Sequence, residues 1–292
     1  MTALDGTHQP FKGILLIVVA TLLFSGHDAL SKYLTAFYPI LMVVWARYLM
    51  HTLLMVGLFL PGSGLRVLRT RRLPLQALRA SCLLATTLFF ITALQYIPLA
   101  EATAVNFLAP LLVTALSVPL LGERVSRGQW AAVLAGFSGV VVIVHPGGEL
   151  FKPSILLALG SATCFCFYQI LTRKLSETDS PTTSNFYAGI TSTLIMSAIV
   201  PFFWQTPTGW HGLLMLALGG LGMVAHLLMT QAFRHAAPAL LAPFGYCQIV
   251  FAGLLGYLLF GHVPEPATLV GIAIICLSGL AAAWMQKRVK AG

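Results

Sequence analysis

The stretch LLFSGHDALSKYL, residues 22–34, combines charged residues with a strongly apolar sequence. It places a histidine, an aspartate and a lysine at the end of an apolar run that begins near Lys12. The rest of the chain is equally apolar: 58% of its residues are hydrophobic, 9% are charged, and the mean hydropathy is +0.88. A soluble domain carries roughly 25% charged residues. The composition therefore predicts a membrane protein, in which each charge inside an apolar run needs a physical reason.

Apolar runs between polar, glycine or proline breaks predict ten membrane-spanning helices. A helix rises about 1.5 Å per residue, so roughly 20 apolar residues cross a bilayer. The predicted spans are residues 12–34, 39–60, 75–96, 99–120, 129–145, 154–175, 183–204, 212–234, 238–260 and 267–286. The first run is longer than the apolar core of a signal peptide, and no small-x-small cleavage site follows it. We therefore expect an all-α membrane protein with no soluble domain.

The positive charges are distributed unevenly between the two sides of the predicted bundle. All lysines and arginines except Lys32, Arg47 and Lys152 fall on the side of the N-terminus, and Arg79 is counted there, near the start of the third span. Positively charged loops stay in the cytoplasm. This predicts a multi-pass protein of the inner cell membrane with both termini cytoplasmic. The net charge of +9 follows from the same bias, and no basic domain exists to bind nucleic acid.

The chain also repeats itself. A shift of 139 positions pairs TALQYIPLA (92–100) with QAFRHAAPA (231–239), and a shift of 141 pairs Phe24 with Phe165. Each half, residues 12–145 and 154–286, contains five predicted spans, so the second half enters the membrane from the opposite side. Inverted repeats of this kind build secondary transporters, whose substrate site lies near the midplane between the halves. The hairpins at Pro98 and Pro238 then close opposite faces, and we expect them to act as movable gates.

The pattern ALQYIPLAEATAVNFLAPLLVTALSVPLLGERVSRGQWAAVLAGFSGV, residues 93–140, resembles the first-half signature of the drug/metabolite transporter superfamily, in its EamA branch. The arginine of WARYL and the pair Gly122-Glu123 are similar to that branch too. The second half departs from the pattern, with His262 in place of Glu123 and Phe186 in place of Arg47. The resemblance implies two inverted five-helix repeats around a central cavity, and transport of small metabolites without ATP. Within the branch, the chain is most similar to amino-acid exporters of the YddG type.

Polar residues on the first two spans are candidates for the substrate pathway. Thr21, Ser25, Asp28 and Lys32 are spaced by 4, 3 and 4, which places them on one face of a helix, and His27 lies roughly 100° away from Asp28. Arg47 lies at a similar depth in the second span, with His51 four residues later. Asp28 and Arg47 are predicted to lie within reach of one another, directly or through water, either as a structural ion pair or along the pathway. His51 and His226 are candidate ligands or hydrogen-bonded core histidines.

The fourth, sixth and ninth spans supply the other candidates. Thr103, Asn106, Pro110, Thr114 and Ser117 form a stripe on the fourth span, which indicates cavity lining or hydrogen bonds between helices. On the sixth span, Phe165, Tyr168 and Gln169 can meet a substrate or pack against neighbours. On the ninth, small residues such as Gly253 and Gly256 suit close packing, whereas Tyr246 and Gln248 can reach a cavity. Glu101 is interpreted as a hydrated residue at the rim.

Several function classes lack the residues that they require. No serine, cysteine or zinc motif accompanies His27, Asp28 and His51, so an enzyme is not expected. The five cysteines lie inside apolar spans without zinc-ligand spacing, so no metal or other cofactor is predicted. A channel would need rings of charge or filter carbonyls, and the single, asymmetric charges of this chain argue against one. The fifth and tenth spans are rich in small residues and are expected at the periphery, where Gly136 and Gly139, or Gly271 and Gly279, would also permit a dimer; the chain is predicted to be a monomer or homodimer.

The sequence therefore predicts a secondary transporter, an exporter or facilitator, that works by alternating access. The favoured substrates are small amphipathic metabolites, above all neutral or aromatic amino acids, which can use both the charges and the aromatic side chains. A nucleotide sugar, a nucleoside or a drug is the alternative. The phosphates of a nucleotide sugar call for clustered arginine or lysine. Arg47 is the only arginine or lysine predicted to lie well inside a span and away from the cytoplasmic rim, so a nucleotide sugar ranks second. The outward direction rests on the resemblance to exporters.

Overall fold

The computed structural model describes residues 10–122, 125–145, 152–176, 178–236 and 238–291, in which helices and short connections occur and no β-strand is found. In chain order the elements are α1 (Pro10–Leu34), α2 (Ile40–Ser63), η1 (Gly64–Leu68), α3 (Leu73–Ala93), α4 (Leu99–Asn106), α5 (Ala109–Leu121), α6 (Arg127–Ile143), α7 (Ile155–Leu175), α8 (Pro181–Ile199), η2 (Val200–Phe203), α9 (Gly209–His235), α10 (Pro238–Gly245), α11 (Cys247–Phe260) and α12 (Pro266–Ala291). Within the described residues, 9 spans are long and apolar enough to cross a membrane, and α6 is a shorter tenth. The predicted all-α fold of ten membrane-spanning helices is confirmed.

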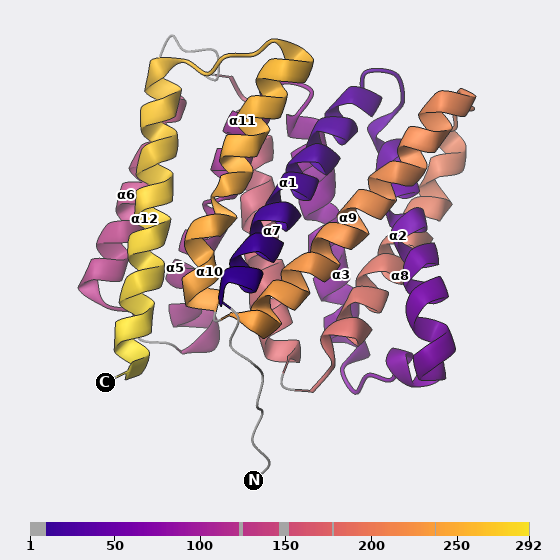
Figure 1. The fold of residues 1–292 in the computed structure, drawn as a ribbon, viewed down its shortest axis with the longest axis horizontal. Coiled ribbons are helices and arrows are strands. Elements are labelled where there is room, and N and C mark those ends of the chain that lie inside the picture. The colour runs from indigo at the N-terminus through magenta and orange to yellow at the C-terminus, as the bar shows by residue number, and fades with distance from the viewer. Residues whose placement is uncertain (1–9, 123–124, 146–151, 177, 237, 292) are drawn as a thin grey trace.

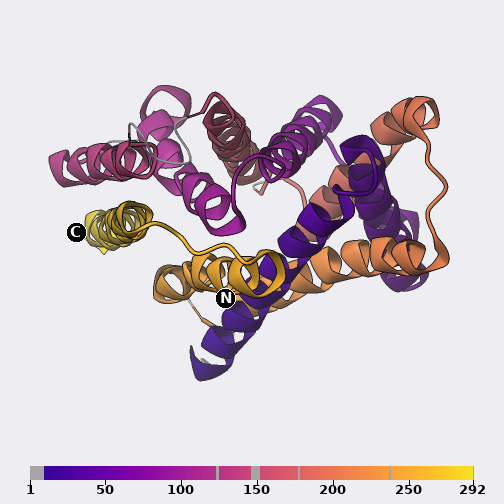
Figure 2. The ribbon, with the colours of Figure 1, turned by 90° about the horizontal axis from the view of Figure 1, so that it is seen from above.

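The helices run between two faces of the molecule. The start of α1 and the end of α12 lie on the same face, at the bottom of Figure 1, which we call the termini face. The opposite face, where α1 ends and α12 begins, is the far face. Figure 2 shows α6 beside α12 at one edge of the bundle, away from the crossing of α1 and α9. The predicted peripheral position of these two spans is therefore observed.

Two of the predicted spans are broken helices, and the breaks fall at equivalent points. The fourth span divides into α4 and α5 just before Pro110, which has no N–H to continue the hydrogen-bond ladder. The ninth divides into α10 and α11 at Tyr246, next to Gly245. Phe107 and Tyr246 are related by the 139-residue shift, and their ring centroids are 5.1 Å apart. Broken helices near the midplane are typical of transporters built from inverted repeats.

Helix packing follows the same internal symmetry. α1 packs on α9 as its equivalent α7 packs on α3, and α2 packs on its own equivalent, α8. The hydroxyl oxygens of Thr52 and Thr193, which are 141 positions apart, lie 2.9 Å from each other. Contacts between equivalent residues are expected where a two-fold axis passes between two copies. The fold is therefore a pair of inverted five-helix repeats.

Glycines hold α6 and α12 together within one chain. A Cβ atom added to Gly139 would lie 2.9 Å from the carbonyl oxygen of Gly271, and one added to Gly271 would lie 2.6 Å from that of Gly139. A Cβ on Gly279 would overlap the hydroxyl of Tyr246. Small residues allow this approach of two helices in a membrane. These glycines therefore serve internal packing, which corrects their interpretation as a dimer face; the oligomeric state stays a prediction.

The far face is closed by packing between the two halves. α4 packs along α11, where Gly253 faces Ala100 and Gly256 faces Leu99, with Cβ separations of 3.8 and 3.9 Å if a Cβ is placed on each glycine. The predicted close packing at these two glycines is confirmed. Between the equivalent elements α5 and α10 on the termini face, no comparable packing is found in the described part of the chain. The halves are thus joined on the far face.

Two polar contacts strengthen this closure. Lys32 Nζ donates to the carbonyl oxygens of Leu94 and Ile97 within the first half, at 2.6 and 2.9 Å, and reaches the second half by lying 5.5 Å from the ring centroid of Phe260 at the end of α11. His262 Nε2 lies 2.9 Å from Oε1 of Glu101, in the first turn of α4. Glu101 is only 2% exposed, so its interpretation as a hydrated rim residue is wrong. The cause is α11, which covers the start of α4.

Candidate functional site

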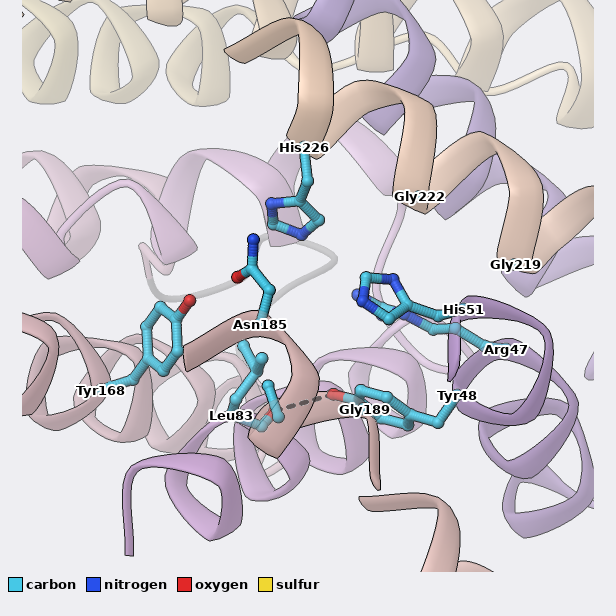
Figure 3. Close-up of a pocket in the computed structure, with 11 residues that line it drawn as sticks. Arg47, Tyr48, His51, Leu83, Tyr168, Asn185, Gly189, Gly219, Gly222 and His226 are labelled. Atoms are coloured by element: carbon cyan, nitrogen blue, oxygen red, sulfur yellow. Dashed lines mark hydrogen bonds between the residues drawn. The ribbon is translucent and has the colours of Figure 1, made fainter. Parts of the chain in front are cut away.

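A cavity between α2, α3, α7, α8 and α9 brings polar side chains together inside the membrane-spanning region (Figure 3). Its lining residues are Arg47, Tyr48, His51, Leu83, Tyr168, Asn185, Ala188, Gly189, Gly219, Gly222 and His226. The space open to the centre of a water molecule is ≈ 20 Å³. About 10–15 Å³ of such space holds one water. The cavity is therefore large enough for water in this conformation, and a metabolite needs it to widen.

Glycines determine how closely the surrounding helices approach. A Cβ atom on Gly219 would lie 2.9 Å from the carbonyl oxygen of Arg47, so α9 touches the backbone of α2 there. A Cβ on Gly189 would lie 2.7 Å from the hydroxyl oxygen of Thr52, and one on Gly222 would lie 3.4 Å from Cδ2 of His27. These approaches place the long polar side chains of α2 opposite those of α8 and α9. Figure 3 shows His51, Asn185 and His226 pointing toward one another from these three helices.

Arg47 does not form the predicted direct ion pair with Asp28. Its guanidinium lies over the ring of Tyr48, 5.3 Å from the ring centroid. The Tyr48 hydroxyl is held in turn, 2.7 Å from Oγ1 of Thr87. Arg47 lines the same cavity as His51 and His226. The direct pair is thus corrected, because Arg47 lies over Tyr48 at the cavity wall; contact with Asp28 through water stays a prediction.

Asp28 belongs to a polar cluster that joins α1 to α11. Nδ1 of His27 lies 3.0 Å from Oδ1 of Asp28, and Nε2 of Gln248 donates to Oδ2 at 3.4 Å. The hydroxyl of Ser25 donates to the carbonyl oxygen of Gln248 at 2.9 Å. Nε2 of His27 is buried beside Gly222 and has no hydrogen-bond partner among the described residues. The predicted residues His27, Asp28 and Gln248 therefore meet in one cluster next to the cavity.

Aromatic rings surround the polar groups. Phe24 meets His226 edge to face with centroids 4.9 Å apart, and His51 meets His226 at 6.4 Å. Phe165 stacks on Tyr168 at 5.5 Å with an interplanar angle of 11°. An aromatic face is suited to an apolar part of a ligand. The cavity region thus combines a cation, imidazoles and aromatic surface.

Three polar residues at this site, Tyr48, Arg79 and Asn185, were not predicted as site residues. Arg79 was counted as a loop charge, but it is 2% exposed and donates to the hydroxyl of Tyr168 at 2.8 Å. Arg79 lies three residues after Gln76 inside an apolar run, so the two share one face of a helix. The same spacing of polar residues identified the candidates on the first and fourth spans, and it could have identified Arg79. Asn185 lines the cavity from α8. It has no polar counterpart at the equivalent position of the first half, so the repeat gave no signal for it.

The other predicted residues do not line the cavity. The hydroxyl of Thr103 donates to the carbonyl oxygen of Leu99 in its own helix, and Asn106 accepts a hydrogen bond from Ser161 at 3.0 Å. Gln169 is half-buried on α7. Tyr246 packs against Phe107 and against α12. Of the two hairpin prolines, Pro98 directly precedes α4 and Pro238 is the first residue of α10. Glu123 and Ala237 lie outside the described residues. Arg47, His51, Tyr168 and His226 alone among the predicted residues line the cavity, so the role of the rest in a pathway stays a prediction.

The chemistry of the cavity wall is that of a binding site for a polar solute. Arginine, histidine, tyrosine and asparagine supply hydrogen-bond donors, and no carboxylate lines the wall in the part of the chain that the structure describes. No group of three or more histidine, cysteine, aspartate or glutamate residues that could hold a metal ion occurs among those residues. The site is therefore suited to binding an anionic or polar group.

Comparison with known proteins assigns the family. The sequence profile described as "EamA-like transporter family" matches residues 11–145 and 152–283. The S-adenosylmethionine uptake transporter of Rickettsia prowazekii is 26% identical, covering 97% of this chain and 96% of that protein. The riboflavin transporter of Vibrio cholerae is 29% identical over 93% and 92%, and the pseudopaline exporter CntI of Pseudomonas aeruginosa is 27% identical over 94% and 97%.

A solved crystal structure has a similar fold. It matches with a TM-score of 0.67 and 26% identity, covering 94% of this chain and 98% of the solved one. The family profile covers both halves of the chain, and the full-length relatives are named as transporters. The chain therefore belongs to the EamA-like transporter family, as a multi-span membrane transporter of small metabolites and not an enzyme.

Proposed function

We propose that this protein is a secondary carrier for small amphipathic metabolites that contain an amino-acid group, above all neutral or aromatic amino acids. It moves them by alternating access without ATP. We also propose, from the charges of the loops, that the termini face is cytoplasmic in the inner membrane. The outward direction of transport rests on the resemblance to exporters alone.

One observation carries the choice of substrate: a cation lines the cavity and an acid lies next to the cavity, beside aromatic rings. Arg47 lines the cavity, and its guanidinium is suited to a carboxylate. Asp28 lies next to the cavity through its contact with His27, and it can accept hydrogen bonds from an ammonium group. Phe24 and the Phe165–Tyr168 stack offer surface for a side chain. A zwitterion with an apolar side chain uses all three features.

The names of the relatives support the amphipathic class. S-adenosylmethionine carries the amino-acid group of methionine together with a ring system, and riboflavin joins a polar chain to an aromatic ring system. A nucleotide sugar fits less well. Its phosphates need clustered cations, and Arg47 is the one arginine or lysine that lines the cavity among the described residues.

The structure suggests how the carrier would change state. The observed state is closed on the far face, where α4 packs on α11, Lys32 lies over the ring of Phe260, and His262 pairs with Glu101. Opening that face requires these contacts to break. The helix breaks at Phe107 and Tyr246 let α4 and α11 tilt without moving α5 and α10. The Pro98 and Pro238 hairpins would then act as gates on opposite faces.

Uptake into proteoliposomes tests the proposal. The purified chain would be reconstituted without ATP and offered labelled phenylalanine, leucine, S-adenosylmethionine, riboflavin and a nucleotide sugar, with and without a pH gradient. We expect saturable uptake of at least one amino acid above empty liposomes. Uptake that collapses when the pH is equalised would indicate proton coupling, whereas unchanged uptake would indicate facilitated diffusion. Transport of the nucleotide sugar but of no amino acid would refute the substrate class.

A further inference from the structure

Arg79 is a buried cation for which the proposed function has no role. It sits in α3 about 9 Å from the start of that helix at 1.5 Å per residue. Its side chain is among the largest fully buried ones in the described chain. Burying a charge within a membrane is expensive, and such residues are retained for function or are paired. The partners of Arg79 therefore decide what it does.

The hydrogen-bond partners that Arg79 has among the described residues are all neutral. Nε donates to the hydroxyl of Thr172 at 2.6 Å, Nη1 to the carbonyl oxygen of Ser184 at 2.8 Å, and Nη2 to the hydroxyl oxygen of Tyr168 at 2.8 Å. No carboxylate of the described residues forms an ion pair with it. Asp179, on the nearby α7–α8 connection, accepts hydrogen bonds from Thr70 and Gln76 instead. Three neutral acceptors orient the guanidinium, and no carboxylate in the described part of the chain neutralises its charge.

The charge of Arg79 reaches the cavity through Tyr168. The guanidinium lies over the Tyr168 ring, 4.4 Å from its centroid, and Tyr168 lines the cavity. Because Nη2 donates to the phenol oxygen, the proton of that phenol must point elsewhere, and no acceptor for it occurs among the described residues. A hydroxyl that accepts a hydrogen bond from a cation is polarised and becomes a stronger donor.

We propose that Arg79 is a positioning residue that turns the Tyr168 hydroxyl into a strong donor aimed at the cavity, so that the site selects ligands bearing a carboxylate. The inference rests on the proposed function and adds to it a selectivity for the free acid. Tyr168 contacts the carboxylate directly, and Arg79 acts through Tyr168 and through its unneutralised charge. A carboxamide or an alcohol in the same place gains much less from this donor.

The test compares an amino acid with its amide and its amino alcohol. Phenylalanine, phenylalaninamide and phenylalaninol would be used in proteoliposome uptake, with KM and maximal rate measured separately for wild type, Tyr168→Phe, Arg79→Gln and Arg79→Lys. Tyr187→Phe is a matched control, because its hydroxyl donates to the carbonyl oxygen of Leu68 on another side of α8. Thermal stability of each variant in detergent checks that it folds.

In the wild type we expect phenylalanine to have the lowest KM. Tyr168→Phe and Arg79→Gln should each raise the KM for phenylalanine about tenfold or more, the loss expected for a hydrogen bond to a charged group. The KM for the amide and the alcohol should change less than about twofold. Arg79→Lys keeps the charge and should fall between wild type and Arg79→Gln, and Tyr187→Phe should behave as wild type. If Arg79→Gln does not fold, Tyr168→Phe alone decides the outcome.

Equal loss for all three compounds would overturn the inference, because it would show a purely structural role. A wild-type protein that moves phenylalanine without distinguishing it from the amide would also overturn the inference and leave the proposed function standing. A wild-type protein that moves no amino acid would overturn both.

Discussion

His262→Ala should open the far face, because it removes the partner of a buried carboxylate. His262 lies 2.9 Å from Glu101, which is 2% exposed and whose second oxygen has no hydrogen-bond partner among the described residues. Removing one member of a dry pair costs about 3–5 kcal/mol. The His262 side chain is 22% exposed, so solvent weakens the pair and we expect roughly 1–3 kcal/mol. Since about 1.4 kcal/mol is a factor of ten, the open population should rise roughly 5- to 150-fold.

Cysteine labelling measures this change. The five native cysteines would first be replaced. A single cysteine would then be introduced by Ala100→Cys on α4, because this position is 3% exposed and packs against α11. Its rate of reaction with a polar maleimide, measured in detergent, reports how often the junction opens. His262→Ala should accelerate labelling of the reporter by the factor above. His145→Ala is the matched control, since its pair with Glu265 is 3.6 Å long and more than one third exposed on both sides. A labelling rate in His262→Ala that matches wild type would refute the proposal that the His262–Glu101 pair holds the far face closed.

Two other predictions follow from the packing. Asp28→Asn and Arg47→Gln should couple by less than about 1 kcal/mol in thermal stability, because the two side chains form no direct pair and are predicted to meet only through water; a larger coupling in the double variant would show that they pair directly. Gly271→Val should lower the melting temperature, by an amount corresponding to about 1–3 kcal/mol or more, because any Cβ there meets the Gly139 carbonyl. Gly57→Val, where a Cβ meets nothing within 4 Å, is its control, and equal behaviour of the two would contradict the packing.

The sequence predicted the layout of the molecule well, because the physics of that layout is local. Twenty apolar residues in a row identify a span, and the 139-residue shift identifies the repeat without any knowledge of the fold. That shift also relates Phe107 to Tyr246, whose contact was not predicted. A repeat specifies which residues are equivalent, but it does not specify which of them the two-fold axis brings together.

Charges were predicted less well, because their partners come from other helices. Asp28 and Arg47 lie at similar depths, and depth alone suggested a pair; the structure turns Asp28 toward Gln248 and Arg47 toward Tyr48. Glu101 lies near a helix end, as a rim residue would, but α11 covers it. Arg79 lies close to a positive loop and was assigned to it, although Tyr168, 89 residues away in sequence, holds it inside the bundle. The partner of a charged residue depends on how its helix is rotated and on which other helices cover it. Neither can be predicted from the sequence of a single span.

Counterflow of labelled phenylalanine into proteoliposomes, with no ATP and no ion gradient, tests the central claim most directly. Liposomes preloaded with unlabelled phenylalanine and containing the wild-type chain should transiently accumulate the label, which exchange through a carrier produces. Arg47→Gln should raise the half-saturating concentration tenfold or more, because Arg47 is the cation proposed to hold the carboxylate. Absence of counterflow with any amino acid, or identical saturation curves for wild type and Arg47→Gln, would contradict it.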